Sequence, residues 1–132
     1  MNNSLFEHEI TDGRISFVLP LKTVSEANIS EHWTKKHKRH QQQKRIIQLA
    51  ILPHRDKIQI PCTITFTRYS PRFLDKHDNL PYSFKAACDI VCNILTPGLK
   101  PGRADDNEEI SIKYAQIKSK TYFIKIEFDW TN

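Results

Sequence analysis

Apolar and polar residues alternate in four stretches of the chain, and each stretch predicts a β-strand. The stretches are residues 14–22, 59–70, a segment beginning at Ile110, and 121–130. The second is the clearest, because Cys62, Ile64 and Phe66 alternate with three threonines. The three polar residues 118–120, between the last two strands, predict a hairpin turn.

Two other stretches repeat apolar residues at the spacing of an α-helix. The first covers residues 30–52; its first half is strongly basic, its apolar residues gather near its end, and Pro53 terminates it. The second runs from about Leu80 to Leu95, and Pro81 fits its first turn, where a missing N–H costs nothing. The apolar residues of this second helix form a stripe expected to be buried: Leu80, Phe84, Ala87, Cys88, Val91 and Leu95.

The predicted order is strand, helix, strand, helix, strand, strand. It indicates an α/β fold: a small mixed sheet of about four strands with two main helices. A chain of 132 residues suits one compact domain, so we assign residues 1–132 to a single domain.

Composition adds three expectations. The three cysteines, Cys62, Cys88 and Cys92, form no CxxC pair and predict buried thiols of a reducing compartment, with metal ligation as the alternative. No apolar run approaches the roughly 20 residues that cross a bilayer, and the N-terminus lacks a basic leader and an apolar segment. We therefore expect no membrane association and a cytoplasmic location.

Charge is distributed unevenly. Residues 31–72 contain ten Lys and Arg against two acidic residues, whereas residues 73–109 contain seven acidic residues against four basic ones. This division suits a protein that holds a polyanion with one part and acts on it with another, although a solvated, variable surface explains it equally well.

The second helix carries a polar stripe opposite its apolar one. Asp78, Tyr82, Lys85 and Asp89 are spaced four, three and four residues apart, which places them on one face of a continuous helix. If the acidic pair Asp105–Asp106 meets this face, the carboxylates form an oxygen-rich site of the kind that Mg²⁺ prefers. The alternative is a turn that caps a helix, plus a separate acidic loop.

At these residues the sequence resembles the RusA family of Holliday junction resolvases, known from phages and bacteria. The resemblance rests on "LDKHDNLPYSFKAACDIV" from Leu74, on "GRADDNEEI" from Gly102, and on "FVLPLKTVSEANISEHW" from Phe17. It implies a compact α/β domain that forms a two-fold homodimer and cuts branched DNA with Mg²⁺, or with Mn²⁺ as a substitute. A two-fold dimer suits a four-way junction, because one site then faces each of two opposing strands.

The resemblance also implies roles for individual residues. Asp75, Asp78, Lys85 and Asp106 are the expected catalytic residues, and Lys85 is expected to assist at the phosphate. Asp89 resembles the aspartate that follows the family's lysine. The expected metal ligands are Asp75, Asp78, Asp105 and Asp106.

One position departs from the family pattern. The family's first aspartate lies two residues before the position of Asp78, where this chain has Lys76, which cannot bind magnesium. Either a bulge brings Asp75 onto the side of Asp78, which we favour, or His77 takes part, or the site is weakened.

Other residues are expected to contact DNA. The candidates are Lys35, Lys36, Lys38 and Arg39 on the basic helix, Arg68 and Arg72 beside the acidic turn, and Asn79. Surface charge without a DNA contact is the alternative for the two arginines. We interpret Trp33 and Trp130 as packing residues rather than as platforms for base stacking.

The sequence thus favours a magnesium-dependent, structure-selective endonuclease that resolves Holliday junctions or related branched DNA. A catalytically weak or inactive module that binds branched DNA is the main alternative, and Lys76 is the residue that favours it. A regulatory protein without a nucleic-acid partner is the third possibility.

Overall fold

The computed structural model describes residues 7–24, 33–97 and 109–131 of the chain. The elements within these residues, in chain order, are β1 (His8–Thr11), β2 (Arg14–Leu19), α1 (Trp33–Ile51), the 3₁₀ helix η2 (Leu52–Lys57), β3 (Cys62–Ser70), α2 (Asn79–Ser83), α3 (Lys85–Leu95), β4 (Ile110–Lys118) and β5 (Phe123–Asp129). The fold is mixed α/β, as the sequence predicts. None of the described helices combines the length and apolar character needed to cross a bilayer.

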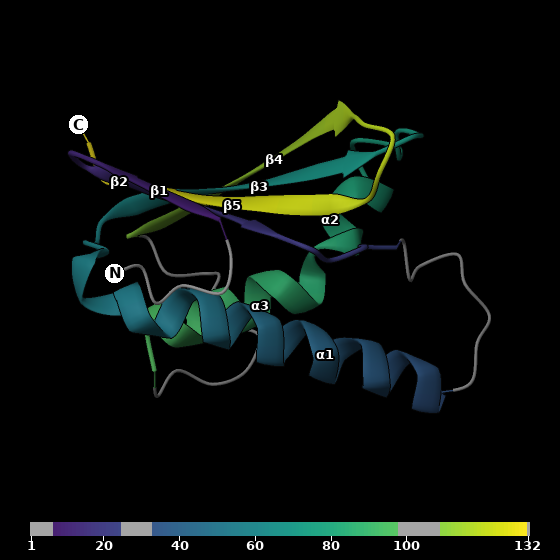
Figure 1. The fold of residues 1–132 in the computed structure, drawn as a ribbon, viewed down its shortest axis with the longest axis horizontal. Coiled ribbons are helices and arrows are strands. Elements are labelled where there is room, and N and C mark those ends of the chain that lie inside the picture. The colour runs from purple at the N-terminus through teal and green to yellow at the C-terminus, as the bar shows by residue number, and fades with distance from the viewer. Residues whose placement is uncertain (1–6, 25–32, 98–108, 132) are drawn as a thin grey trace.

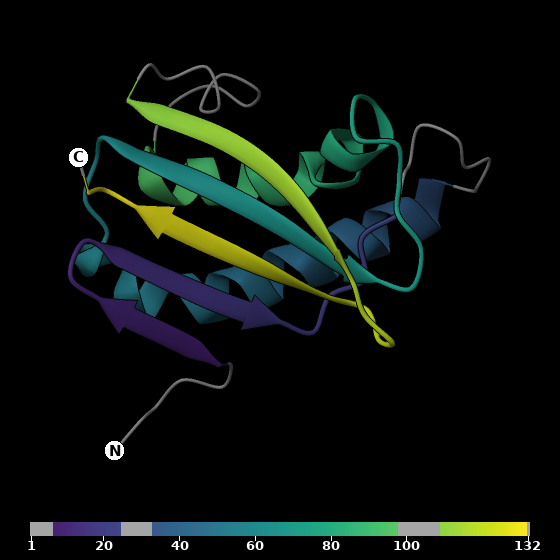
Figure 2. The ribbon, with the colours of Figure 1, turned by 90° about the horizontal axis from the view of Figure 1, so that it is seen from above.

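The strands form one mixed sheet in the order β1-β2-β5-β3-β4. Figure 2 shows this order from the uncovered side of the sheet. β3 and β4 pair in parallel, and the other neighbours are antiparallel. The parallel pair is joined through α2 and α3, because two parallel neighbours need a crossover connection rather than a tight turn.

The predicted hairpin at residues 118–120 is wrong. β4 and β5 do not pair with each other, because β3 lies between them and pairs with both. Two strands that follow each other closely in the chain often pair as a hairpin. Here β4 pairs in parallel with one edge of β3, and β5 pairs with the other edge of β3.

The sheet has one strand more than the sequence predicts. β1 pairs with β2 across a two-residue turn, Asp12–Gly13, and Gly13 has a φ of +80°. A Cβ atom at Gly13 would also meet the side chain of Thr131, but it is the positive φ that favours glycine here.

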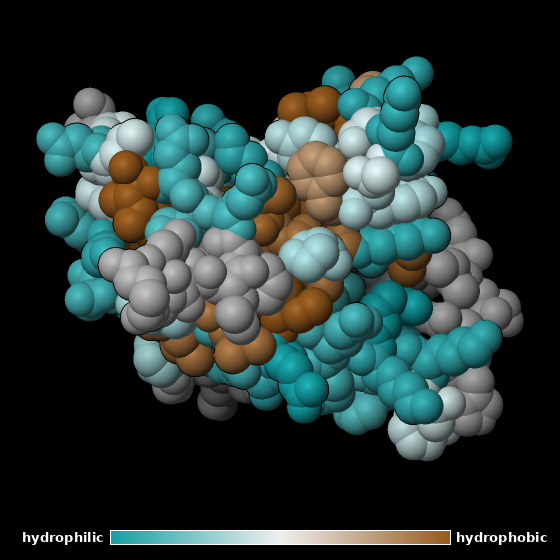
Figure 3. All heavy atoms as spheres, in the orientation of Figure 1, coloured by the Kyte–Doolittle hydropathy of each residue, from teal (hydrophilic) through white to brown (hydrophobic). Residues whose placement is uncertain are grey.

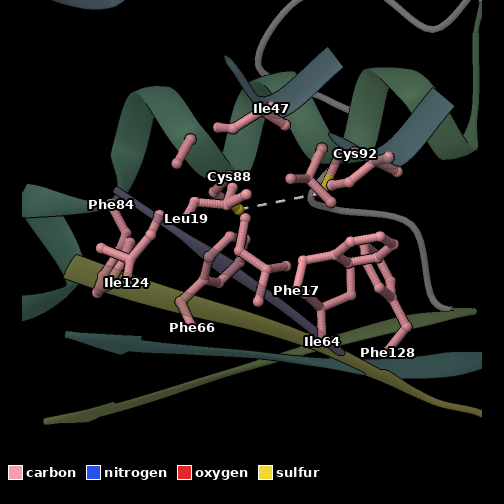
Figure 4. Packing of buried hydrophobic residues seen from close by; sticks show 14 of the residues in the cluster. Phe17, Leu19, Ile47, Ile64, Phe66, Phe84, Cys88, Cys92, Ile124 and Phe128 are labelled. Atoms are coloured by element: carbon pink, nitrogen blue, oxygen red, sulfur yellow. Dashed lines mark hydrogen bonds between the residues drawn. The ribbon is translucent and has the colours of Figure 1, made fainter. Parts of the chain in front are cut away.

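All three α-helices lie on one face of the sheet, which makes a two-layer structure (Figure 1). The core lies between the layers and joins alternate residues of β2, β3 and β5 to α1 and α3 (Figure 4). The cysteines belong to it as predicted: all three are buried free thiols, and the sulfur atoms of Cys88 and Cys92 lie 4.0 Å apart.

The helix predicted from Leu80 to Leu95 is divided at Phe84. Phe84 has φ and ψ of −100° and 5°, outside the helical range, and its N–H donates to the carbonyl of Pro81 at 3.1 Å. Its side chain is fully buried, with ring centroids 5.3 Å from Phe66 and 6.0 Å from Tyr114. The break therefore occurs where an aromatic ring enters the core.

Candidate active site

The candidate site begins at the turn that follows β3, and two sets of hydrogen bonds hold this turn. The amide side chain of Gln116, on β4, donates to the carbonyl of Leu74 at 2.8 Å and accepts from its N–H at 2.9 Å. The carbonyl of Arg72 accepts from the guanidinium of Arg68 at 2.9 Å and from the hydroxyl of Ser70 at 2.6 Å. The chain thus enters the acidic turn from a fixed point on the sheet.

Asp75 and Asp78 lie in this turn and differ in their local contacts. The carboxylate of Asp75 accepts the N–H of Asp78 at 2.9 Å, and its carbonyl accepts the N–H of Leu80 at 2.7 Å. Asp78 precedes the first residue of α2 as its N-cap, but its side chain makes no capping hydrogen bond. Asp75 therefore stabilises the turn, while the carboxylate of Asp78 is not used to close the helix.

The polar stripe predicted on the second helix lines a single hollow. Asp78, Tyr82, Lys85 and Asp89 border a space of about 400 Å³, together with His77 and Tyr114 among others. The expectation that these four residues share a face is confirmed, although the helix that carries them is not continuous. One basic side chain and two acidic ones thus open onto a surface depression beside Tyr114 of β4.

The second half of the predicted metal site lies outside the described residues. Asp105 and Asp106 belong to residues 98–108, so their meeting with Asp78 stays a prediction. Within residues 7–24, 33–97 and 109–131, no three His, Cys, Asp or Glu side chains are grouped as metal ligands. Asp75 lies in the turn but does not border the hollow.

The two arginines of the predicted DNA clamp occupy different environments. The Arg68 side chain is only 6% exposed, and its guanidinium donates to the carbonyl of Thr23, the hydroxyl of Ser70 and the carbonyl of Arg72. Burial lowers the pKa of Arg68 below its usual value. These contacts favour a positioning role for Arg68 behind the turn, whereas Arg72 is exposed at the surface.

The remaining DNA-binding candidates are on α1 and at the start of α2. Lys35, Lys36 and Lys38 are exposed on the first turns of α1, while Arg39 is half-buried, as is Asn79 on α2. Further along α1, a larger surface hollow of about 990 Å³ is bordered mainly by basic and amide side chains of the helix. The basic half of α1 is therefore a solvent-facing surface, as its composition suggests.

The structure corrects one of the two tryptophan interpretations. Trp130 is half-buried and packs against the core, as predicted. Trp33 is 70% exposed, so its interpretation as a packing residue is wrong. The apolar residues of α1 that pack are at its other end, which leaves its first turn without a core to enter.

Sequence reasoning missed two residues that shape the site. Gln116 holds the turn, and Tyr114 borders the hollow while its ring stacks near Phe84. Both are on β4, about 40 positions from the turn, and the alternation that predicts β4 says nothing of what its side chains contact. The parallel pairing of β3 with β4, if known, would have indicated them, because it brings Gln116 opposite Arg68.

No protein-family model matches this chain, and no curated protein has a matching sequence.

Proposed function

We propose that this protein is a magnesium-dependent, structure-selective endonuclease that cuts branched DNA, Holliday junctions among it. The observation that supports the proposal most directly is the hollow shared by Asp78, Lys85 and Asp89. Carboxylates beside a lysine in a surface hollow are suited to phosphodiester chemistry.

The donor chemistry of the turn fits a hard divalent cation. Asp78 contributes a carboxylate that is not used in capping, and Asp89 borders the same hollow. In the proposal, Asp78 and Asp75 hold Mg²⁺ together with Asp105 and Asp106, and Mn²⁺ can replace it. When bound, such an ion activates water and stabilises charge on the reacting phosphate.

The chain's own residues have complementary tasks in this proposal. Lys85 is positioned by the first turn of α3 to approach the phosphate and neutralise its developing charge. Lys35, Lys36 and Lys38 bind neighbouring phosphates, which makes affinity depend on salt. Arg68 acts indirectly, because its hydrogen bonds fix the turn that carries the acidic residues.

The proposal includes a two-fold homodimer. A four-way junction has two opposing strands that must be cut in the same way, and a dimer related by a two-fold axis presents one site to each. The structure is of one chain, so size measurement in solution, by sedimentation or light scattering, tests this element.

A DNA-binding module without nuclease activity is the second candidate, and one contact favours it. Lys76 occupies the position of the family's first aspartate, and the carboxylate of the neighbouring Asp75 already accepts a backbone hydrogen bond from Asp78. Because Oδ2 of Asp75 is engaged in that bond, a metal ion would have to bind Asp75 through Oδ1 or share Oδ2.

A nicking assay on a synthetic four-way junction separates the two candidates. With Mg²⁺ present, we expect cleavage by the natural chain and a loss of at least about 100-fold in Asp78→Asn, the size typical for loss of one preorganised electrostatic group. Asp56→Asn is the matched control, because Asp56 is an exposed carboxylate on η2, away from the hollow. It should cut like the natural chain.

Binding measured on the same samples completes the test. Asp78→Asn should still shift the junction in a gel, and the shift should weaken as salt is raised. Junction binding without any cutting would identify the chain as a binding module. No salt-sensitive DNA affinity at all would leave a protein-interaction role instead.

A further inference from the structure

The first turns of α1 present an aromatic and basic surface that packing does not explain. Trp33, the first residue of the helix, is 70% exposed, and its ring meets the ring of His37 edge-on at 6.5 Å between centroids. Trp33 and His37 are one turn apart and therefore project on the same side of α1. At this exposure most of the Trp33 ring is accessible from solvent, and a tryptophan ring combines a flat apolar face with an N–H donor.

This aromatic pair continues into the larger hollow along α1. His37 borders it, followed by Lys38, Gln41, Lys44 and Arg45, which all lie on the outer side of the helix. Figure 3 shows hydrophilic side chains over this part of the molecule, below the sheet. The surface thus offers, in sequence along the chain, flat rings, cationic and amide groups, and then the apolar side chains of Leu49, Leu52 and Pro53.

We propose that this surface binds an unpaired nucleic-acid strand, with one base stacked on Trp33 and its phosphates held by Lys38, Lys44 and Arg45. Single strands are bound in this way elsewhere: aromatic rings take the exposed faces of bases while a positive groove follows the backbone. A paired duplex hides its base faces within the stack, so an exposed ring has little to contact there. The inference deepens the proposed function, because it makes an unpaired arm or flap part of the substrate.

The charges of this surface argue against a second copy of the chain as its occupant. Two such surfaces would bring Lys38, Lys44 and Arg45 against the same three cations. An acidic peptide would neutralise the cations, but it would offer no bases to stack on the exposed aromatic pair. A nucleic-acid strand offers phosphates for the cations and bases for the aromatic rings.

Tryptophan fluorescence gives a direct test, because the chain has only two tryptophans. In Trp130→Phe, Trp33 is the sole reporter, and we expect an oligothymidylate of about 12 nucleotides, within the usual range of single-strand sites, to quench it. In Trp33→Phe, the half-buried Trp130 is the sole reporter, and its emission should stay constant. Equal quenching in both variants, or none in either, would overturn the proposal.

Affinity measurements test the stacking and the phosphate contacts separately. Trp33→Ala should weaken oligothymidylate binding by roughly 5- to 150-fold, the range found for loss of one stacked base, and Trp33→Phe by less. Lys44→Gln should reduce the salt slope of log affinity by about 0.7. A polyglutamate that binds as tightly and quenches Trp33 equally would overturn base stacking and assign the surface to acidic proteins.

The outcome is separable from that of the nuclease proposal. Asp78→Asn should leave oligothymidylate binding unchanged, because Asp78 lies in the other hollow. If no DNA is cut by any variant, the nuclease proposal fails while the fluorescence result still decides the role of Trp33. If the chain is a nuclease, Trp33→Ala should lower cleavage of a junction with an unpaired arm more than cleavage of a fully paired one.

Discussion

α1 and α3 cover the same face of the sheet, but they are used differently. α3 is buried along its length through Ala87, Cys88, Val91, Cys92 and Leu95. In α1 the buried residues begin only at Gln43, and Trp33 and Lys36 before it are exposed. Packing therefore explains an apolar stripe along the full length of α3, but only the second half of α1. The comparison shows that the basic half of α1 is free to change without cost to the core, so packing does not explain its composition.

The strongest test of this comparison removes the aromatic ring of Phe84, the residue directly before α3. Phe84→Ala deletes a fully buried side chain between Phe66 and Tyr114, and we expect it to lower the free energy of unfolding by about 3–5 kcal/mol. Leu49→Ala on α1 is the control, because Leu49 is 51% exposed, and it should change stability by less than about 0.5 kcal/mol. Equilibrium denaturation of both variants measures the difference, and equal losses would contradict it.

The next test addresses how α3 ends. The guanidinium of Arg55, on η2, donates to the carbonyls of Ile94 and Leu95 at the C-terminus of α3, and to that of Ile58. Arg55→Ala leaves these partly buried acceptors without their donor, so a loss of about 1–3 kcal/mol is expected in denaturant titration.

A substitution on the exposed part of α1 is the counterpart of Arg55→Ala. Lys36→Ala removes a cation of comparable length from the helix surface and should leave stability within about 0.5 kcal/mol of the natural value. A loss equal to that of Arg55→Ala would mean that the basic half of α1 contributes to the fold after all.

The smallest expected effect is a change of the free energy of unfolding with pH, which arises from His54 on η2. Burial, and next the neighbouring His8, lower the pKa of His54 below its usual 6.5; the two rings lie 4.6 Å apart. Well above pH 6.5 His54 is neutral in both states and adds no pH dependence. As the pH falls below 6.5, the unfolded chain binds the proton first, so stability decreases.

Denaturation curves recorded on both sides of that pH measure the effect. His54→Gln should lose less stability on acidification than the natural chain. His37→Gln, an exposed substitution on α1, should lose as much as the natural chain. If His54→Gln is as acid-sensitive as the natural chain, the packing around His54 does not influence its protonation.

Sequence alone predicted the elements whose residues alternate or repeat strongly. It missed β1 because this strand has one large apolar residue, Ile10, which is itself 44% exposed. Its pairing depends on main-chain bonds and on the turn at Gly13, not on burial. It also missed the break at Phe84, because the helical spacing of apolar residues continues through it.

The candidate site was predicted where it depends on local spacing and missed where it depends on long-range contact. The face shared by Asp78, Tyr82 and Lys85 follows from their spacing along the chain, which the break at Phe84 does not disturb. The bonds of Gln116 to Leu74 span 42 residues, and nothing in the neighbourhood of either residue indicates the other. The burial of Arg68 was missed for the same reason, since its contact with Thr23 depends on how the sheet is assembled.

The pair of bonds between Gln116 and Leu74 has a consequence for how the acidic turn moves. A side-chain amide that both donates to and accepts from one backbone residue imitates a strand partner, and it ties Leu74 to the edge strand β4. The segment leading to Asp75 is thereby anchored like a strand, although it has the sequence of a loop. Any distortion of the edge strand β4 should accordingly be transmitted to the acidic turn.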